Sequence, residues 1–199
     1  MNKKQGKKSQ LKRRKASIKR NNERQKKTKH PEMPKLMIVN FFQTECQEPP
    51  ISTSNFGVCD NQDGQKAYTD STDATKWIAN VENPNTLSIT FTAIDNCIPI
   101  LRGDGNDEKR CDGMLTYTDN IVFIELKEVA KSWISDAIEQ LEITVQHFIA
   151  NHDISAYKHK RAFACNKKHP QFQVIDTETK RRFFDRYRIR LNLQHTIKV

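Results

Sequence analysis

The amino-acid sequence predicts an α/β domain, in which a mixed β-sheet is flanked by helices, preceded by a disordered basic tail. Three observations predict this class. Between residues 87 and 126, apolar and polar residues alternate in short segments, which is typical of strands. From Ser132 onward, apolar residues recur with the period of a helix. Residues 1–35 hold 15 Lys and Arg against two acidic residues.

Residues 1–35 are predicted to be a disordered polybasic tail. Residues 1–32 contain almost no apolar side chains, so folding could not offset the entropy lost on ordering them. Residues 36–199 are predicted to form a single domain, because the whole chain of 199 residues is near the size of one hydrophobic core. The net charge of +10 therefore comes from the tail and suggests a polyanionic partner such as nucleic acid.

The first elements of the domain are short. The apolar run 36–42 predicts a strand, and residues 56–59 predict a second one. Residues 74–81 fit a short helix with Asp73 as its N-cap, although three of their apolar residues also alternate as in a strand. Both interpretations remain open at this stage.

The later elements have clearer patterns. Residues 87–93 predict a strand, and residues 114–118 and 121–126 predict two strands joined as a hairpin. A helix of about four turns follows from Ser132. We then expect a strand over 161–165, a basic helix capped by Asp176 and a final strand over 189–193, as their patterns indicate.

The candidate chemistry lies in residues 110–128, which read RCDGMLTYTDNIVFIELKE. Asp112 opens the first hairpin strand, whereas Glu125 and Lys127 lie near the end of the second. Side chains two residues apart share one face of a strand, and pairing of the hairpin would place Asp112 across from them. Two carboxylates and an ammonium at one place can bind Mg²⁺ and act on an attacking water.

A structural role for these three residues is the alternative. Glu125 and Lys127 could form a pair on the solvent side of the sheet, and Asp112 could be a turn residue. Against this, the strand that contains Glu125 is almost continuously apolar, as strands buried on both faces are. Charges at the end of such a strand need partners.

Asp112, followed by an apolar strand that ends in Glu125-Leu126-Lys127 and then by a helix, resembles the PD-(D/E)XK nuclease superfamily. The resemblance implies a restriction-endonuclease-like αβββαβ core over roughly residues 73–170. It implies that Asp112, Glu125 and the Leu126 carbonyl bind Mg²⁺ or Mn²⁺, and that Lys127 acts on the nucleophilic water. The implied activity is hydrolysis of phosphodiester bonds in DNA or RNA, in defence, a mobile element or repair.

The match to the superfamily is partial. Cys111 stands where the superfamily's name has Pro. Gln140 matches a Gln that many members carry on the helix after the third strand and is a further candidate catalytic residue, but Thr144 stands where some of them have Tyr. Some members use a Glu on the first helix, for which Glu82 and Asp95 are both candidates.

Five basic residues around the strand predicted for 161–165 are candidate nucleic-acid contacts: Lys158, Lys160, Arg161, Lys167 and Lys168. A solvated basic face is the competing interpretation. The competing function is a non-catalytic nucleic-acid-binding or adaptor protein on the same fold. Either form could act as a homodimer or as a subunit of a larger complex.

The cysteines predict the compartment. All five are scattered without the spacing of metal ligands, so we expect reduced thiols in a reducing compartment. Cys97 and Cys111 could approach each other, but their spacing alone does not predict a structural zinc site. The sequence contains neither an apolar run of membrane-spanning length nor an N-terminal secretory pattern, so we expect a cytoplasmic protein without a membrane partner.

Overall fold

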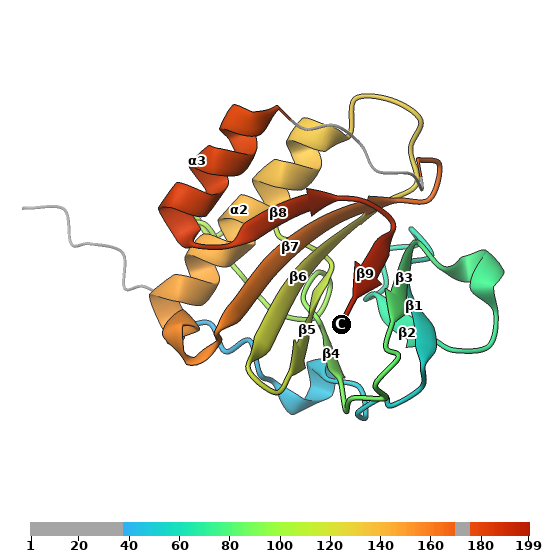
Figure 1. Ribbon diagram of the computed structural model, residues 1–199. Helices are drawn as coiled ribbons and strands as arrows, with labels where there is room; N and C mark the ends of the chain where they lie inside the picture. Colours follow the sequence, from blue (N-terminus) through green and yellow to red (C-terminus); the bar gives the residue numbers. More distant parts are fainter. Residues whose placement is uncertain (1–37, 170–175) are drawn as a thin grey trace, which may run out of the picture. The chain divides into compact units, whose positions relative to one another are not determined.

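The computed structural model describes residues 38–169 and 176–199. The tail predicted for residues 1–35 lies outside these ranges. Within them the chain forms two mixed β-sheets and two α-helices (Figure 1), so the prediction of a mixed α/β fold is confirmed. No helix in the described part of the chain is long and apolar enough to cross a membrane.

The larger sheet has five strands in the order β4-β5-β6-β7-β8. β4 and β6 both pair with β5 in antiparallel fashion, whereas β6, β7 and β8 run parallel. The bounds are β4 Thr90–Ala93, β5 Gly113–Tyr117, β6 Asn120–Lys127, β7 His159–Asn166 and β8 Arg190–Leu193. The predicted hairpin is therefore confirmed as β5 and β6, which are joined by a two-residue turn.

Two helices cover one face of this sheet. α2 (Ile134–Asn151) connects β6 to β7, and α3 (Thr177–Tyr187) lies between β7 and β8, as parallel neighbours require a crossover. Apolar side chains of α2 such as Leu141 and Phe148 share one core with the sheet. Asp176 caps α3 as predicted, because its carboxylate accepts a hydrogen bond from the Thr179 amide at 2.7 Å.

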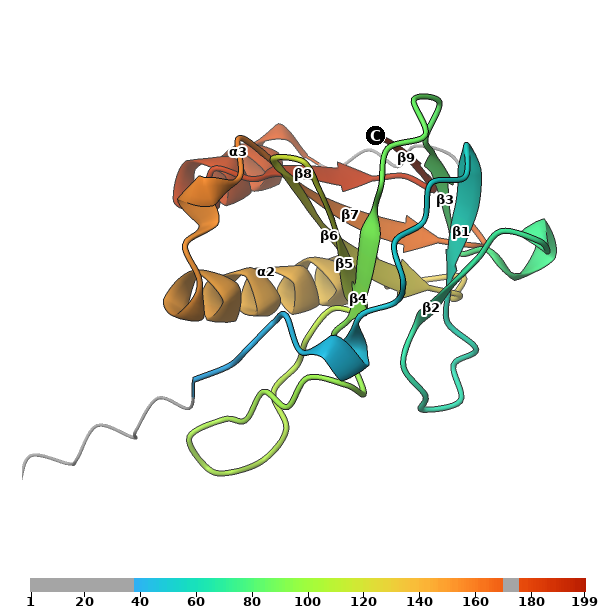
Figure 2. The same cartoon turned by 90° about the horizontal axis from the view of Figure 1, so that it is seen from below.

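The smaller sheet covers the other face of the larger one, as the second core and the view in Figure 2 both show. Its strand order is β2-β1-β3-β9. The bounds are β1 Asn55–Cys59, β2 Tyr68–Asp70, β3 Ala79–Glu82 and β9 Thr196–Lys198. The expected arrangement, in which helices flank the sheet, is wrong for this face, and β9 has no counterpart in the prediction.

The helix predicted for residues 74–81 is not formed. A short 3₁₀ turn, η2 (Ala74–Lys76), is followed directly by β3, so the alternating pattern was the better guide. β3 pairs with both β1 and β9 and buries Ala79 and Val81 completely. Pairing on both sides satisfies more backbone groups than a helix of two turns, whose ends leave amides and carbonyls unpaired.

The strand predicted for residues 36–42 is also wrong where the structure describes it, from residue 38. The Val39 amide donates to Asn151 Oδ1 at 3.0 Å, and the Phe41 amide donates to His152 Nε2 at 3.1 Å. Side chains at the end of α2 therefore satisfy this backbone in place of a strand partner. Two further 3₁₀ turns are η1 (Thr44–Cys46) and η3 (Ile154–Ala156).

The structure contradicts the expectation of five reduced thiols. Cys46 and Cys97 form a disulfide across 51 residues of sequence, which links η1 to the loop after β4. Cys59, Cys111 and Cys165 are free and buried. Because disulfides are uncommon in reducing compartments, the cysteines no longer indicate a reducing compartment. The disulfide also takes Cys97 out of the zinc site considered with Cys111.

Candidate active site

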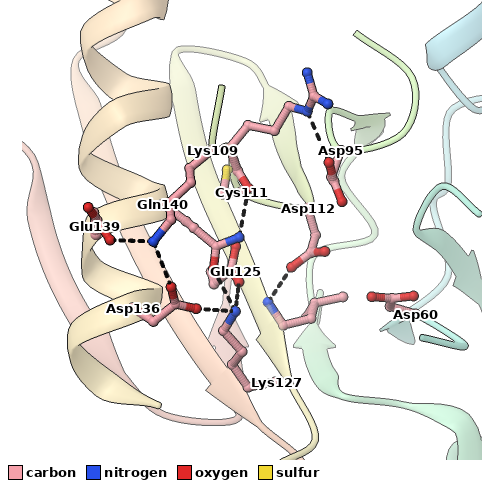
Figure 3. Close-up of polar contacts among 12 residues, drawn as sticks. Asp60, Asp95, Lys109, Cys111, Asp112, Glu125, Lys127, Asp136, Glu139 and Gln140 are labelled. Carbon is pink, nitrogen blue, oxygen red and sulfur yellow. Dashed lines mark hydrogen bonds and ion pairs between the residues drawn. The ribbon is translucent and has the colours of Figure 1, made fainter. Parts of the chain in front are cut away.

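The hairpin register brings the three predicted residues together. Gly113 of β5 lies opposite Ile124 of β6, so Asp112 comes level with Glu125 one step further along. The Leu126 amide, which lies between Glu125 and Lys127 in the chain, donates to Asp112 Oδ2 at 2.6 Å. Figure 3 shows this group beside α2.

Both carboxylates of the group are buried. Glu125 is 1% exposed and Asp112 is 8% exposed. Glu125 Oε1 lies 2.7 Å from Lys127 Nζ, whereas Glu125 Oε2 is buried without a hydrogen-bond partner. Asp112 forms no ion pair with any residue in the described ranges. A buried carboxylate oxygen without a partner is costly, so the site is left with an unfilled acceptor.

The pKa values of both carboxyl groups are displaced upward. Burial raises the pKa of Asp112 to about 7. The negative charge of Asp60 also raises this pKa, whereas the hydrogen bond from Leu126 lowers it. Burial raises the pKa of Glu125 well above its usual value, and the charge of Asp112 adds to this while Lys127 opposes it. The two groups therefore need more positive charge nearby if both are to be ionised at neutral pH.

Lys127 is held by three acceptors. Its Nζ lies 2.7 Å from Glu125 Oε1, 2.9 Å from Asp136 Oδ2 and 2.5 Å from Gln140 Oε1. An ammonium has three N–H groups, so all of them are used. Burial opposes the charge of Lys127, but the two carboxylates outweigh it and raise the pKa. Lys127 is therefore a cation at neutral pH.

α2 fixes the segment that leads into Asp112. Gln140 Nε2 donates to the Arg110 carbonyl at 3.1 Å, and the Cys111 amide donates to Thr144 Oγ1 at 2.7 Å. Thr144 in turn donates to the Gln140 carbonyl at 2.9 Å. Thr144 thus supplies a hydroxyl that holds the backbone next to Asp112.

The sequence reasoning missed Asp136. This residue lies one helical turn before Gln140 and contacts both Lys127 and Lys109, the latter at 3.2 Å. Residues four apart share one face of a helix, so the spacing from Gln140 was a signal that could have identified it. Asp60 was also missed. It directly follows β1 of the smaller sheet, and the sequence pattern did not predict that this sheet packs beside the hairpin (Figure 3).

The two candidates for an additional acidic residue lie in different places. Asp95 forms an ion pair with Arg110, whose Nε lies 2.9 Å from its Oδ1, and the negative charge of Asp95 raises the pKa of Asp112. Glu82 lies in β3 of the smaller sheet, where Lys198 Nζ is 3.6 Å from its carboxylate. Of the two, Asp95 belongs to the surroundings of Asp112.

The five basic residues predicted to bind nucleic acid do not form one surface. Lys167 and Lys168 follow the end of β7, at the level of Lys127. Lys158 precedes β7, and Lys160 and Arg161 lie in its first three residues. The eight residues of β7 span about 23 Å, so these two groups lie at opposite ends of the sheet.

No group of three or more His, Cys, Asp or Glu side chains in residues 38–169 and 176–199 is arranged to hold a metal ion. Asp112 and Glu125 are therefore the oxygen donors to consider. No family model, curated protein or solved structure matches the chain.

Proposed function

We propose that the chain is a metal-dependent nuclease that hydrolyses phosphodiester bonds in DNA or RNA. The observation that carries the proposal is the buried, unpartnered Oε2 of Glu125 beside the buried carboxylate of Asp112. These oxygens lie at the end of a strand, next to an ammonium. Such a set of oxygens is suited to bind a cation.

The order of elements supports a restriction-endonuclease-like core. β4, β5, β6, α2 and β7 follow one another in the βββαβ order that the resemblance to PD-(D/E)XK nucleases implies. Asp112 directly precedes the second of these strands, and Glu125 and Lys127 lie in the third. The preceding helix of that core has no match, because η2 and β3 occupy the corresponding stretch.

The donor set fits Mg²⁺ or Mn²⁺. Asp112, Glu125 and the Leu126 carbonyl would hold the ion through oxygen. Mg²⁺ is commonly bound by one or two carboxylates and completes its shell with waters and substrate phosphate, so a third acidic side chain is not required. When bound, the ion supplies positive charge to the phosphoryl oxygens and lowers the pKa of a coordinated water.

Lys127 would orient reacting groups and would not accept a proton, because it is already protonated. Its contact with Glu125 holds that carboxylate in place, and Gln140 fixes the ammonium from the other side. Asp136, whose side chain is 45% exposed, is the partner that a substrate or water could displace. Release of Asp136 would free one N–H for the nucleophilic water.

The test is cleavage of single- and double-stranded DNA and RNA with Mg²⁺ or Mn²⁺, comparing wild type with Glu125→Gln. The substitution preserves size but removes the charge that holds the ion. We expect the single-turnover rate to fall at least about 100-fold, with nucleic-acid binding retained. Glu139→Gln is the matched control, because Glu139 is exposed and its carboxylate contacts Lys109; its rate should equal that of wild type.

Equal rates for Glu125→Gln and wild type would contradict the proposal. The second candidate is a non-catalytic nucleic-acid-binding or adaptor protein on the same fold. The contacts of Lys127 favour this candidate. All three of its N–H groups are used within the protein, as they would be in a purely structural ion-pair network. Wild-type protein that binds these substrates but cuts none of them with either metal would support that candidate.

A further inference from the structure

A basic cleft lies at the end of β6 and β7 that is opposite to Glu125 and Lys127. Its volume is about 690 Å³, and it is bordered by the beginnings of β7 and β8 and the end of β9. None of its lining side chains is acidic. Six are basic: Lys158, Lys160, Arg161, Arg188, Arg190 and Lys198.

Arg161 and Arg190 both line this basic cleft. They are register partners on the adjacent parallel strands β7 and β8. Phe163, two residues after Arg161, is buried in the core shared with the smaller sheet, so Arg161 begins on that same face. Like charges at neighbouring positions of a sheet destabilise it. The pairing therefore has an energetic cost that folding alone does not explain.

Few carboxylates offset this charge. Asp119 lies 3.0 Å from Lys158, and Glu82 lies 3.6 Å from Lys198. In the described part of the chain no carboxylate pairs with the other four basic residues of the cleft. Arg188 is the C-cap residue of α3, so the partial negative charge at the C-terminus of this helix stabilises its positive charge. The helix terminus does not account for Arg161 and Arg190.

The guanidinium of Arg161 is held in position. Its Nη1 donates to the Lys198 carbonyl at 2.6 Å, and its Nη2 donates to the hydroxyl of Tyr117. The group is thus tied to both sheets, because Lys198 belongs to β9 and Tyr117 to β5. A fixed guanidinium loses little entropy on binding an anion, and its planar geometry suits phosphate oxygens.

The cleft also offers an aromatic surface. Phe184 of α3 lines it and is 38% exposed, although it is a large apolar residue. The guanidinium of Arg188 lies 5.6 Å from the centre of its ring. Exposed rings beside cationic groups are surfaces on which nucleobases stack. A ligand that carries both phosphate and an aromatic base would use the two features together.

We propose that this basic cleft binds the phosphate of a nucleotide, free or within a nucleic-acid strand, through Arg161 and Arg190, while the base stacks on Phe184. The volume is within the range of sites for small ligands. The seven residue steps from Asn120 to Lys127 of β6 span about 23 Å. The cleft is therefore distinct from the carboxylate pair and does not depend on the proposed nuclease activity.

The test measures binding by the full-length protein in metal-free buffer at constant salt. Inorganic pyrophosphate is titrated calorimetrically into wild type, Arg190→Gln and Arg181→Gln. Arg181 is the matched control, since it is an exposed arginine of α3 that does not line the cleft. We expect about a tenfold loss of affinity for Arg190→Gln, as for one charge-assisted contact, and less than about a twofold loss for the control. Equal losses, or no binding of pyrophosphate by wild type, would overturn the proposal.

Two further probes distinguish the source of the phosphate. Thymidine monophosphate is titrated in the same way, and a fluorescein-labelled oligothymidylate is followed by anisotropy. If Arg190→Gln, but not Arg181→Gln, weakens binding of the monophosphate alone, the ligand is a free nucleotide. If it weakens binding of both probes, the site also accepts a nucleic-acid strand. Phe184→Ala should weaken both probes and leave pyrophosphate unaffected. Equal weakening of pyrophosphate would contradict the stacking role.

Thermal melting separates loss of binding from loss of structure. Arg190→Gln removes the repulsion of Arg161, so the variant without ligand should melt at or above the wild-type temperature. Pyrophosphate should raise the melting temperature of wild type, as a ligand of the folded state does. These measurements involve no cleavage, so inactivity of the protein as a nuclease would not count against the cleft.

Discussion

Burial of Asp112 couples stability to pH. The folded-state pKa is about 7, against an ordinary value of 3.8. Between these values the folded protein holds a proton that the unfolded chain has released. Because the folded state binds more protons there, its stability decreases as pH rises from about 4 to about 7. A raised carboxyl pKa therefore acts in the opposite direction to that of a salt-bridged aspartate.

Asp112→Asn should stabilise the metal-free protein at pH 8 and have little effect near pH 4, because Asn needs no proton to remain neutral. The free energy of unfolding in urea, measured from pH 4 to pH 8, checks this expectation. Asp185→Asn is the control, since Asp185 is exposed on α3. If the effect of Asp112→Asn did not change with pH, burial would not be the source of the stability difference.

The convergence of Asp112, Glu125 and Lys127 could be predicted because a short turn joins their strands. A two-residue connection leaves little freedom of register, so the position of each residue along the hairpin determined its neighbours. The spacing from Gln140 places Asp136 on the same face of α2, but the contacts of Asp136 and Arg110 were not predictable in this way. They depend on how α2 packs against β6, which local periodicity does not specify.

At the scale of elements, α2 both covers the larger sheet and positions the segment before Asp112. Thr144 Oγ1 is the acceptor for the buried amide of Cys111. Loss of this acceptor would leave a buried N–H without a partner, which typically costs about 1–3 kcal/mol. One hydroxyl thus contributes both to the stability of the fold and to the position of Asp112.

Thr144→Val should lower the free energy of unfolding by about 1–3 kcal/mol, as measured by urea denaturation. Any cleavage activity should fall further than the change in folded fraction explains, because the backbone next to Asp112 loses its anchor. Thr144→Ser retains the hydroxyl and should recover most of both quantities. A Val variant as stable as the Ser variant would mean that this amide finds another acceptor.

Long, strongly patterned elements were predictable, and so were short strands such as β1 and β8, whereas residues 74–81 and β9 were not. The eighteen residues of α2 and the hairpin strands carry enough repeats of their pattern to exclude alternatives. Residues 74–81 contain about two repeats of either period, so pairing with β1 and β9 decided between helix and strand. β9 was missed because its three residues carry almost no local signal.

For the molecule as a whole, the second sheet and the disulfide were beyond the reach of sequence patterns. Both depend on segments far apart in the chain, as the sequence separation of 51 between Cys46 and Cys97 illustrates. The uneven distribution of charge, by contrast, could be predicted, because it follows directly from the numbers of basic and acidic residues in each segment. The concentration of basic residues in the first 35 positions leads to a prediction for binding of the full chain.

Deletion of residues 1–35 should weaken binding to duplex DNA and flatten its salt dependence. Each phosphate neutralised contributes about −0.9 to the slope of log K against log salt, so loss of about six contacts would reduce the slope by about 5. Anisotropy across a range of KCl concentrations measures it. The urea midpoint should not change, because these residues are almost devoid of apolar side chains. An unchanged slope would assign the binding to basic residues after position 157.

The disulfide between Cys46 and Cys97 encloses β1 to β4 in one covalent loop. The exposed turn at residues 61–64 lies inside that loop. A protease that cuts this turn would create two new chain ends without releasing a fragment, since the pieces stay joined through sulfur. The piece that carries β1 would stay covalently attached after such a break until a thiol reductant opened the bond. From then on only its pairing with β2 and β3 and its core contacts would hold it.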